Sequence, residues 1–130
     1  MESLTLILFA EDDTLIALHL KDALEDAGFK VHHVVDGPAA IAALEAHQAD
    51  LSGLITDIRL GGDVDGWAIG RTARELIPRL PVVYISGDSA HEHTAQGVPD
   101  SFMLQKPFAP AQLVTAISTL LNAVPPPEPT

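Results

Sequence analysis

Cysteine is absent from the sequence, which excludes a disulfide framework and any chemistry that needs a thiolate. No apolar run approaches the roughly 18 consecutive residues that a membrane-spanning helix needs. The first residues, Met1 to Leu4, lack the basic flank of a secretory signal. Basic residues are also scarce, so the surface is poorly suited to nucleic acid. These absences predict a cytoplasmic protein that binds neither membrane nor nucleic acid directly.

Acidic residues, by contrast, are abundant. The chain has 18 Asp and Glu against 7 Lys and Arg, which gives a formal net charge of −11. Such an excess can simply keep a small protein in solution. It can also reflect carboxylates that gather around a cation. Composition leaves both interpretations open, and the order of the residues must decide between them.

Apolar runs of strand length alternate with segments of helical periodicity along the 130 residues, a length that fits one domain. Strands are predicted at residues 4–10, 29–35, 51–56, 81–85 and 101–105, and helices at 14–27, 37–47, 67–77 and from 110 onward. The polar residues 89–100 hold at most a short helix. The domain is predicted to span residues 1–123, followed by a proline-rich, extended tail at 124–130.

This alternation predicts an α/β fold in three layers, α/β/α, with a doubly wound, five-stranded parallel sheet in the middle. Two topologies suit a chain of this size: a flavodoxin-like sheet with strand order 2-1-3-4-5, and a truncated Rossmann sheet. In the first, strands 1 and 3 are neighbours at the switch point where ligands bind.

Polar residues follow four of the predicted strands, and in a parallel sheet these positions share one edge. They are Glu11 and Asp12 after the first strand, Asp57 after the third, Ser86 after the fourth and Lys106 after the fifth. Three neighbouring carboxylates repel one another unless a cation intervenes, and an all-oxygen set suits Mg²⁺ or Mn²⁺. The set indicates a site for a phosphoryl group, with Asp57 as the nucleophile.

At this point the sequence resembles the receiver domain of two-component response regulators, the CheY-like family, in its stand-alone single-domain form. The resemblance extends from about Leu4 to Leu121. The matching motifs are Glu11-Asp12, Asp57, Asp65-Gly66, Ser86 and Lys106-Pro107-Phe108. Each motif alone is weak, but all of them in the expected order and on the expected elements are a strong signal.

The resemblance implies a role for each matching residue. Asp57 accepts a phosphoryl group from a histidine kinase or a histidine phosphotransfer protein. Glu11, Asp12, Asp57 and the backbone carbonyl of Arg59 hold the Mg²⁺. Ser86 and Lys106 contact the phosphoryl oxygens, and the Lys106-Pro107 bond is cis. Such a domain catalyses its own phosphorylation and dephosphorylation but is not a conventional enzyme.

The sequence departs from the family pattern near the expected output surface. Met103 stands three residues before Lys106, where the family usually has Tyr or Phe, so the switch residues are expected to be Ser86 and Met103. The loop after Asp57 is longer and contains Gly61-Gly62. The output is expected to be a contact with a downstream protein, and a homodimer is plausible through residues 89–105 and the last helix.

Two rival functions are weighed against this interpretation. The first is a receiver-like binding module that works without phosphorylation, although the intact acidic set speaks against it. The second is a Mg²⁺-dependent phosphohydrolase with an aspartate nucleophile. Enzymes of the haloacid dehalogenase type usually carry Asp-x-Asp at their first strand and a cap domain, whereas this chain has Glu11-Asp12-Asp13 and no room for a cap.

Overall fold

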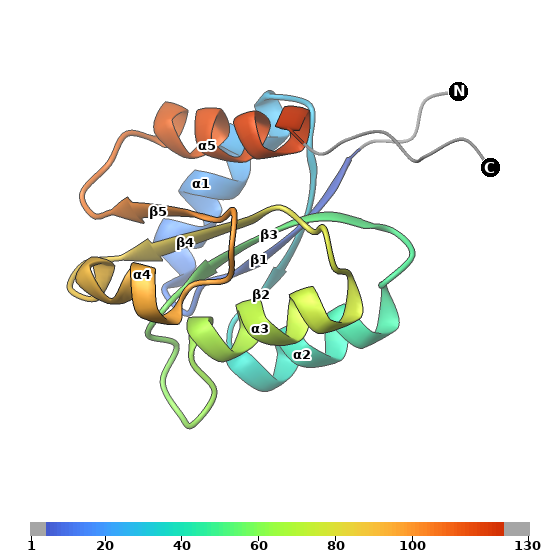
Figure 1. The fold of residues 1–130 in the computed structure, drawn as a ribbon. Coiled ribbons are helices and arrows are strands. Elements are labelled where there is room, and N and C mark those ends of the chain that lie inside the picture. The colour runs from blue at the N-terminus through green and yellow to red at the C-terminus, as the bar shows by residue number, and fades with distance from the viewer. Residues whose placement is uncertain (1–4, 124–130) are drawn as a thin grey trace.

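A computed structural model describes residues 5–123, which form an alternating series of strands and helices (Figure 1). The strands are β1 (Leu6–Ala10), β2 (Lys30–Val34), β3 (Leu51–Asp57), β4 (Val82–Ser86) and β5 (Phe102–Gln105). The helices are α1 (Thr14–Asp26), α2 (Gly37–Ala46), α3 (Gly66–Leu76), the 3₁₀ turn η1 (Ala90–Glu92), α4 (His93–Gln96) and α5 (Pro110–Ala123). The tail predicted at 124–130 lies outside the described residues.

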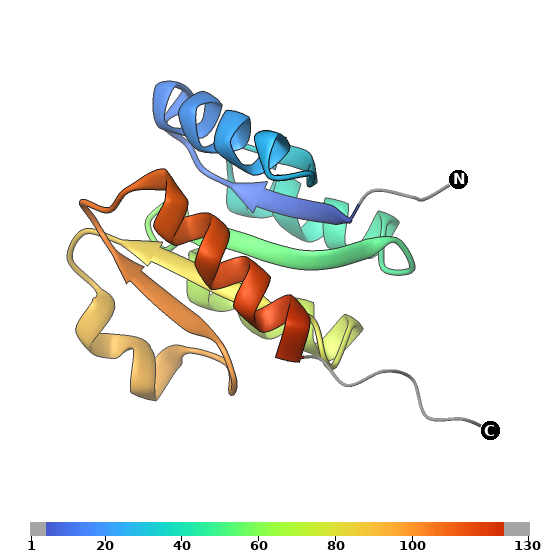
Figure 2. The same cartoon turned by 90° about the horizontal axis from the view of Figure 1, so that it is seen from above.

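All five strands are parallel, and their order across the sheet is β2-β1-β3-β4-β5. Helices α1 and α5 cover one face, while α2 and α3 cover the other and α4 lies beside β5 (Figures 1 and 2). The predicted flavodoxin-like, three-layer α/β/α fold is therefore confirmed. The strand order rejects the truncated Rossmann alternative.

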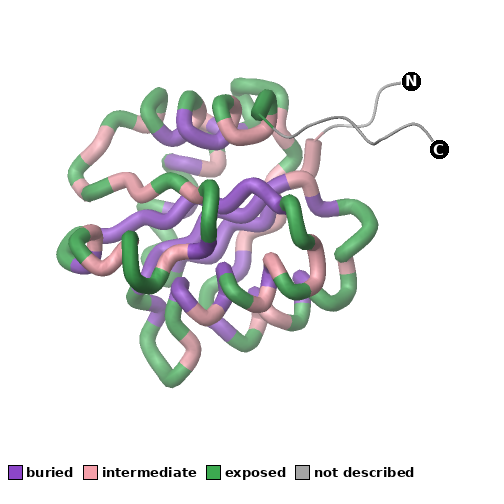
Figure 3. Tube along the Cα trace, in the orientation of Figure 1, coloured by how far each residue is buried: buried purple, intermediate pink, exposed green. Residues whose placement is uncertain are grey.

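The central strands are buried on both faces, as the burial colouring of Figure 3 shows. One core lies between the sheet and α2 with α3, and the other lies between the sheet and α1 with α5. This explains why β1, β3 and β4 are almost continuously apolar instead of alternating. Because helices cover both faces of the sheet, polar side chains gather at the ends of its strands.

Aspartates begin three of the helices. The Asp13 side chain accepts hydrogen bonds from the backbone of Leu15 and Ile16, as a helix N-cap does. Asp36 and Asp65 cap α2 and α3 in the same way. Part of the acidic excess therefore serves helix capping, and these three carboxylates are not part of a cation cluster.

Local differences from the sequence prediction concern the element ends. Ile16 recurs at helical spacing with the buried Leu20 and Leu24 of α1, but its own side chain is 36% exposed. Residues 89–100 contain only η1 and the short α4, as predicted. Over residues 5–123, no helix is long and apolar enough to cross a bilayer.

Candidate functional site

The predicted polar residues meet at the C-terminal edge of the sheet. Asp57 ends β3 and lies level with Ile85, the residue before Ser86 at the end of β4. Glu11 directly follows β1, and Lys106 follows β5. Together they border an open cleft of about 620 Å³. The structure thus brings together side chains that are up to 95 positions apart in the chain, from Glu11 to Lys106.

Three carboxylates form the floor of this cleft. Glu11, Asp12 and Asp57 each offer an oxygen, and these oxygens lie within 4.8 Å of one another. Glu11 is 1% exposed and Asp57 is 6% exposed, whereas Asp12 faces solvent. Two buried carboxylates at this separation repel each other strongly when both are charged.

Lys106 supplies the compensating positive charge. Its Nζ donates a hydrogen bond to Asp57 Oδ2 at 2.7 Å and lies 3.6 Å from Glu11 Oε1. Burial disfavours the charged amine, but the hydrogen bond and the charge of Asp57, followed by the charge of Glu11, raise the pKa of Lys106 above its ordinary value. The ammonium is therefore held at the mouth of the cleft. The cis Lys106-Pro107 bond that the resemblance implied is confirmed.

Glu11 is the least satisfied member of the site. Its Oε2 accepts a hydrogen bond from the Asp13 backbone at 3.1 Å, but its buried Oε1 has no hydrogen-bond partner among the described residues. Burial, followed in the same direction by the charge of Asp57, raises the pKa of Glu11 from 4.5 to about 7, although the Asp13 hydrogen bond and Lys106 oppose the shift. An orphaned buried carboxylate oxygen beside two other carboxylates fits a divalent cation.

Ser86 is held by the turn that follows it. Its Oγ is buried and accepts hydrogen bonds from the backbone N–H groups of Asp88 at 3.1 Å and Ser89 at 2.7 Å. On the other side of the cleft, the backbone N–H of Arg59 donates to Asp57 Oδ1 at 3.2 Å. The backbones of the two loops that follow β3 and β4 are thus both hydrogen-bonded to site residues, Asp57 and Ser86.

Gly66 explains the Asp65-Gly66 motif physically. Helix α3 begins directly behind the phosphoacceptor candidate, and a Cβ added at Gly66 would overlap the carbonyl oxygen of Asp57. The Gly66 N–H also donates to the Ile58 carbonyl at 2.8 Å. Only glycine allows α3 to start this close to Asp57.

The rings of Trp67, Tyr84 and His93 form a cluster near Met103 that the sequence did not predict. Met103 pairs across the sheet with Tyr84, which is fully buried. The Tyr84 ring lies 4.7 Å from Trp67 and 5.8 Å from His93, and its hydroxyl accepts a hydrogen bond from the Val98 backbone. The alternation of strand β4 places Tyr84 on the same face as Ser86, but no sequence pattern indicated its partners.

His33 is another contributor that the sequence did not reveal. Its Nε2 donates a hydrogen bond to the backbone carbonyl of Glu11 at 2.8 Å, because a carbonyl oxygen can only accept. The contact fixes the backbone that presents Glu11 and Asp12. Strand periodicity alone shows that His32 and His33 face opposite sides, not which of them reaches a site.

The fold and the site define a class of protein: a parallel α/β domain with an acidic cluster and a lysine at the C-terminal edge of its sheet. The sequence pattern described as the response regulator receiver domain matches residues 7–118. The chain therefore belongs to the response regulator receiver family of two-component signalling.

Individual relatives agree with this assignment. The chain is 35% identical to the response regulator receiver protein CpdR of Brucella abortus, over 90% of this chain and 97% of CpdR. A solved response regulator receiver protein from Sinorhizobium medicae is 46% identical with a TM-score of 0.91, over 95% of this chain and 98% of that protein. Other curated relatives are transcriptional regulatory proteins, and the chain spans about half of their length.

A more distant solved structure shares the fold. The receiver domain of the sensor histidine kinase PA1611 from Pseudomonas aeruginosa matches with a TM-score of 0.78 at 23% identity, over 93% of this chain and all of that domain. It was solved with a magnesium ion coordinated in its active site cleft.

Proposed function

We propose that the protein is a phosphorylation switch in which Asp57 accepts a phosphoryl group from a phosphohistidine of a histidine kinase or a histidine phosphotransfer protein. The observation that carries this proposal is the surroundings of Asp57. Its carboxylate is buried at a strand end, bonded to Lys106 at 2.7 Å, and flanked by Glu11 and Asp12. A carboxylate with a purely structural role would not need Lys106, Glu11 and Asp12 around it.

The transfer itself is a displacement at phosphorus. An Asp57 carboxylate oxygen attacks the phosphoryl group in line with the leaving nitrogen, the P–N bond breaks, and a P–O bond forms. The histidine departs as neutral imidazole after taking up a proton. Hydrolysis later returns Asp57 and inorganic phosphate, with water as the attacking group. Ser86 and Lys106 are the groups expected to bind phosphoryl oxygens.

A divalent cation, Mg²⁺ or Mn²⁺, would be held by Glu11, Asp12, Asp57 and the backbone carbonyl of Arg59. The oxygen-only donor set and the orphaned Oε1 of Glu11 fit such an ion. Its chemistry would be the neutralisation of charge as the phosphoryl group approaches two buried carboxylates. The magnesium ion of the distant PA1611 receiver domain supports this assignment.

The phosphoryl donor needs a surface on which to dock, and α1 offers one beside the cleft. Leu15 is 79% exposed and Ile16 is 36% exposed, although both are apolar. They border a groove of about 460 Å³ that continues to Lys106, Pro107 and Phe108. Exposed apolar groups that lie together mark protein interaction sites. We assign this groove to the phosphohistidine donor and place the protein in the cytoplasm with it.

The output is assigned to the face formed by α4, β5 and α5, where a downstream protein or a second copy of the chain would bind. Ser86 and Met103 are the proposed switch residues. Met103 has no planar ring to rotate, and its neighbour in strand β4, Tyr84, is fully buried. Motion at this face is therefore expected to originate in the loop after Ser86.

The decisive experiment is phosphotransfer followed by intact-mass measurement. Wild type, Asp57→Asn and Asp63→Asn are incubated with Mg²⁺ and acetyl phosphate or a phosphorylated histidine donor. Asp63 is an exposed carboxylate of the same loop and serves as the matched control. Wild type and Asp63→Asn should gain one phosphoryl group, and Asp57→Asn none. Equal labelling of all three proteins would remove Asp57 from its proposed role.

A further inference from the structure

One ion pair of the described residues borders the acidic cleft without contacting Lys106 or the three clustered carboxylates through its side chains. Of the three ion pairs among residues 5–123, two join Lys106 to site carboxylates, and the third joins Arg59 to Asp88. Arg59 Nη2 lies 2.9 Å from Asp88 Oδ2, and Arg59 Nε donates to Asp88 Oδ1 at 3.1 Å. This two-pronged geometry is the specific mode in which a guanidinium recognises a carboxylate.

Each partner of this pair is tied to a reacting group. Arg59 follows Asp57 by two residues, and its backbone N–H donates to Asp57 Oδ1 at 3.2 Å. Asp88 follows Ser86 by two residues, and its backbone N–H donates to Ser86 Oγ at 3.1 Å. Ser89 completes the turn, since its hydroxyl donates to Asp88 Oδ1 at 3.0 Å. The pair therefore bridges the two loops whose first residues are the phosphoacceptor and the switch serine.

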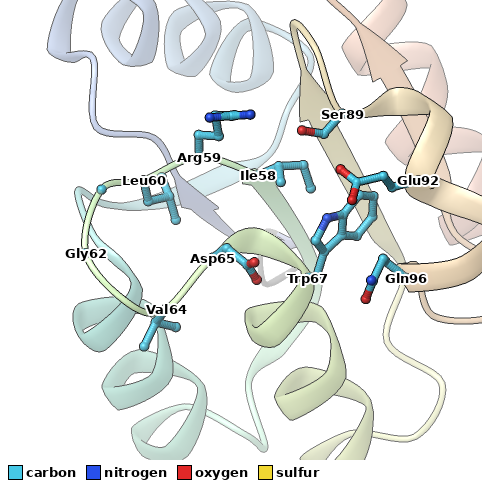
Figure 4. Close-up of a pocket in the computed structure, with 11 residues that line it drawn as sticks. Ile58, Arg59, Leu60, Gly62, Val64, Asp65, Trp67, Ser89, Glu92 and Gln96 are labelled. Atoms are coloured by element: carbon cyan, nitrogen blue, oxygen red, sulfur yellow. The ribbon is translucent and has the colours of Figure 1, made fainter.

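One member of the pair borders two hollows of the surface. Arg59 borders the acidic cleft and also a second cavity of about 550 Å³. Trp67, Ser89 and Glu92 line that cavity, and the Glu92 side chain lies beside the Trp67 ring (Figure 4). In Figure 4 the Arg59 side chain extends toward the segment that carries Ser89. The pair thus lies next to Ser89, which directly precedes η1, and Arg59 borders the same cavity as Trp67.

We propose that Arg59 and Asp88 form a clasp that phosphorylation opens: the guanidinium leaves Asp88 for the phosphoryl oxygens on Asp57, and residues 87–92 are released. The inference rests on the proposed function of Asp57. Phosphorylation replaces the single charge of the Asp57 carboxylate by a phosphoryl group that carries roughly −1.5 to −2 charges and three strong acceptors, against the single charge of Asp88. The side chains of the pair are 75% and 57% exposed, so separating them costs little.

Opening of the clasp would also change the conformation of the output face without the rotation of an aromatic side chain. Tyr84, the neighbour of Met103 in strand β4, is fully buried, and its hydroxyl accepts the Val98 N–H at 3.2 Å. Among residues 5–123, the turn at Asp88 and Ser89 has two sets of side-chain bonds to other segments, the clasp and the hydrogen bonds to Ser86 Oγ, besides the internal bond from the Ser89 hydroxyl to Asp88. When Ser86 and Arg59 both turn to the phosphoryl group, both anchors of that turn are lost together.

The test measures amide hydrogen exchange of Asp88, Ser89 and Glu92 with and without phosphorylation by acetyl phosphate and Mg²⁺. The variants are Arg59→Ala, Asp88→Ala and the double substitution, with Arg79→Ala as the control for loss of an exposed arginine. Wild type and the control should exchange these amides roughly two- to fivefold faster when phosphorylated, a factor that corresponds to an exposed ion pair.

In the unphosphorylated state, Arg59→Ala and Asp88→Ala lose the ion pair but keep the Ser86 hydrogen bonds. They should exchange these amides faster than unphosphorylated wild type and more slowly than phosphorylated wild type, and the double variant should add nothing to either. The emission of Trp67, the single tryptophan, should change in parallel. Arg59→Lys retains the positive charge but cannot form the bidentate contact with Asp88, so its exchange rate should lie between those of wild type and Arg59→Ala. Wild type that is fully labelled on Asp57 but keeps slow exchange at these amides would overturn the clasp and leave the proposed function intact. Wild type that takes up no phosphoryl group would overturn both.

Discussion

Replacing Glu11 by glutamine is expected to stabilise the metal-free protein at alkaline pH. Burial and the charge of Asp57 raise the pKa of Glu11 from 4.5 to about 7 in the folded state. Between these two values the folded protein binds a proton that the unfolded chain releases. The contribution of this group to stability is therefore complete below about pH 4.5 and is lost as the pH rises through 7.

The size of the effect follows from the two pKa values. Their difference corresponds to about 3 kcal/mol, of which about 2–3 kcal/mol is lost between pH 5 and pH 8. Glutamine has nearly the same shape and carries no charge at either pH. Glu11→Gln should therefore exceed the wild type by about 2–3 kcal/mol at pH 8 and by less than about 1 kcal/mol at pH 5.

The assay is urea denaturation at both pH values, in EDTA and in Mg²⁺, followed by the emission of the buried Trp67. Glu25→Gln, an exposed residue of α1, is the control and should leave the pH dependence unchanged. Mg²⁺ should restore the stability of the wild type at pH 8 and stabilise Glu11→Gln much less. A metal-free wild type that is no less stable than Glu11→Gln at pH 8 would refute the reasoning.

Three further substitutions test other parts of the site. Lys106→Met removes both ion pairs of the cleft and should cost about 1–3 kcal/mol at pH 8 in urea denaturation, since 30% of the side chain is exposed; an unchanged midpoint would contradict this. Gly66→Ala should destabilise the fold by about 1–3 kcal/mol and slow the labelling of Asp57, because the added methyl group overlaps its carbonyl. Leu15→Gln should slow labelling by a phosphohistidine protein but leave labelling by acetyl phosphate unchanged; equal slowing by both donors would argue against the docking groove.

The sequence was sufficient to predict the fold and the convergence of the polar side chains. Strand periodicity, the apolar runs of β1 and β4, and the aspartate caps are local signals that tertiary packing reinforces here. The meeting of Glu11, Asp57 and Lys106 follows from topology, because the C-terminal ends of parallel strands share one edge. The roles assigned to these residues are still predictions.

Other features could not be predicted because they depend on side-chain conformation and on loop geometry. The Arg59–Asp88 pair joins two loops that are 29 positions apart, and no periodic pattern records such a contact. The hydrogen bond from His33 to the Glu11 carbonyl is likewise a matter of register between β1 and β2. The exposure of Ile16 could not be predicted either, because helical spacing describes a face of the helix but not which part of that face is covered.

The most direct test of phosphoryl transfer to Asp57 is to locate the modified residue chemically. Borohydride reduces an aspartyl phosphate to homoserine, and peptide mass spectrometry then reads the position of the conversion. After incubation with a phosphorylated histidine donor and Mg²⁺, homoserine should be found at position 57 and at no other aspartate. Conversion at Asp12 or Asp13 with residue 57 unaltered would contradict the proposed function.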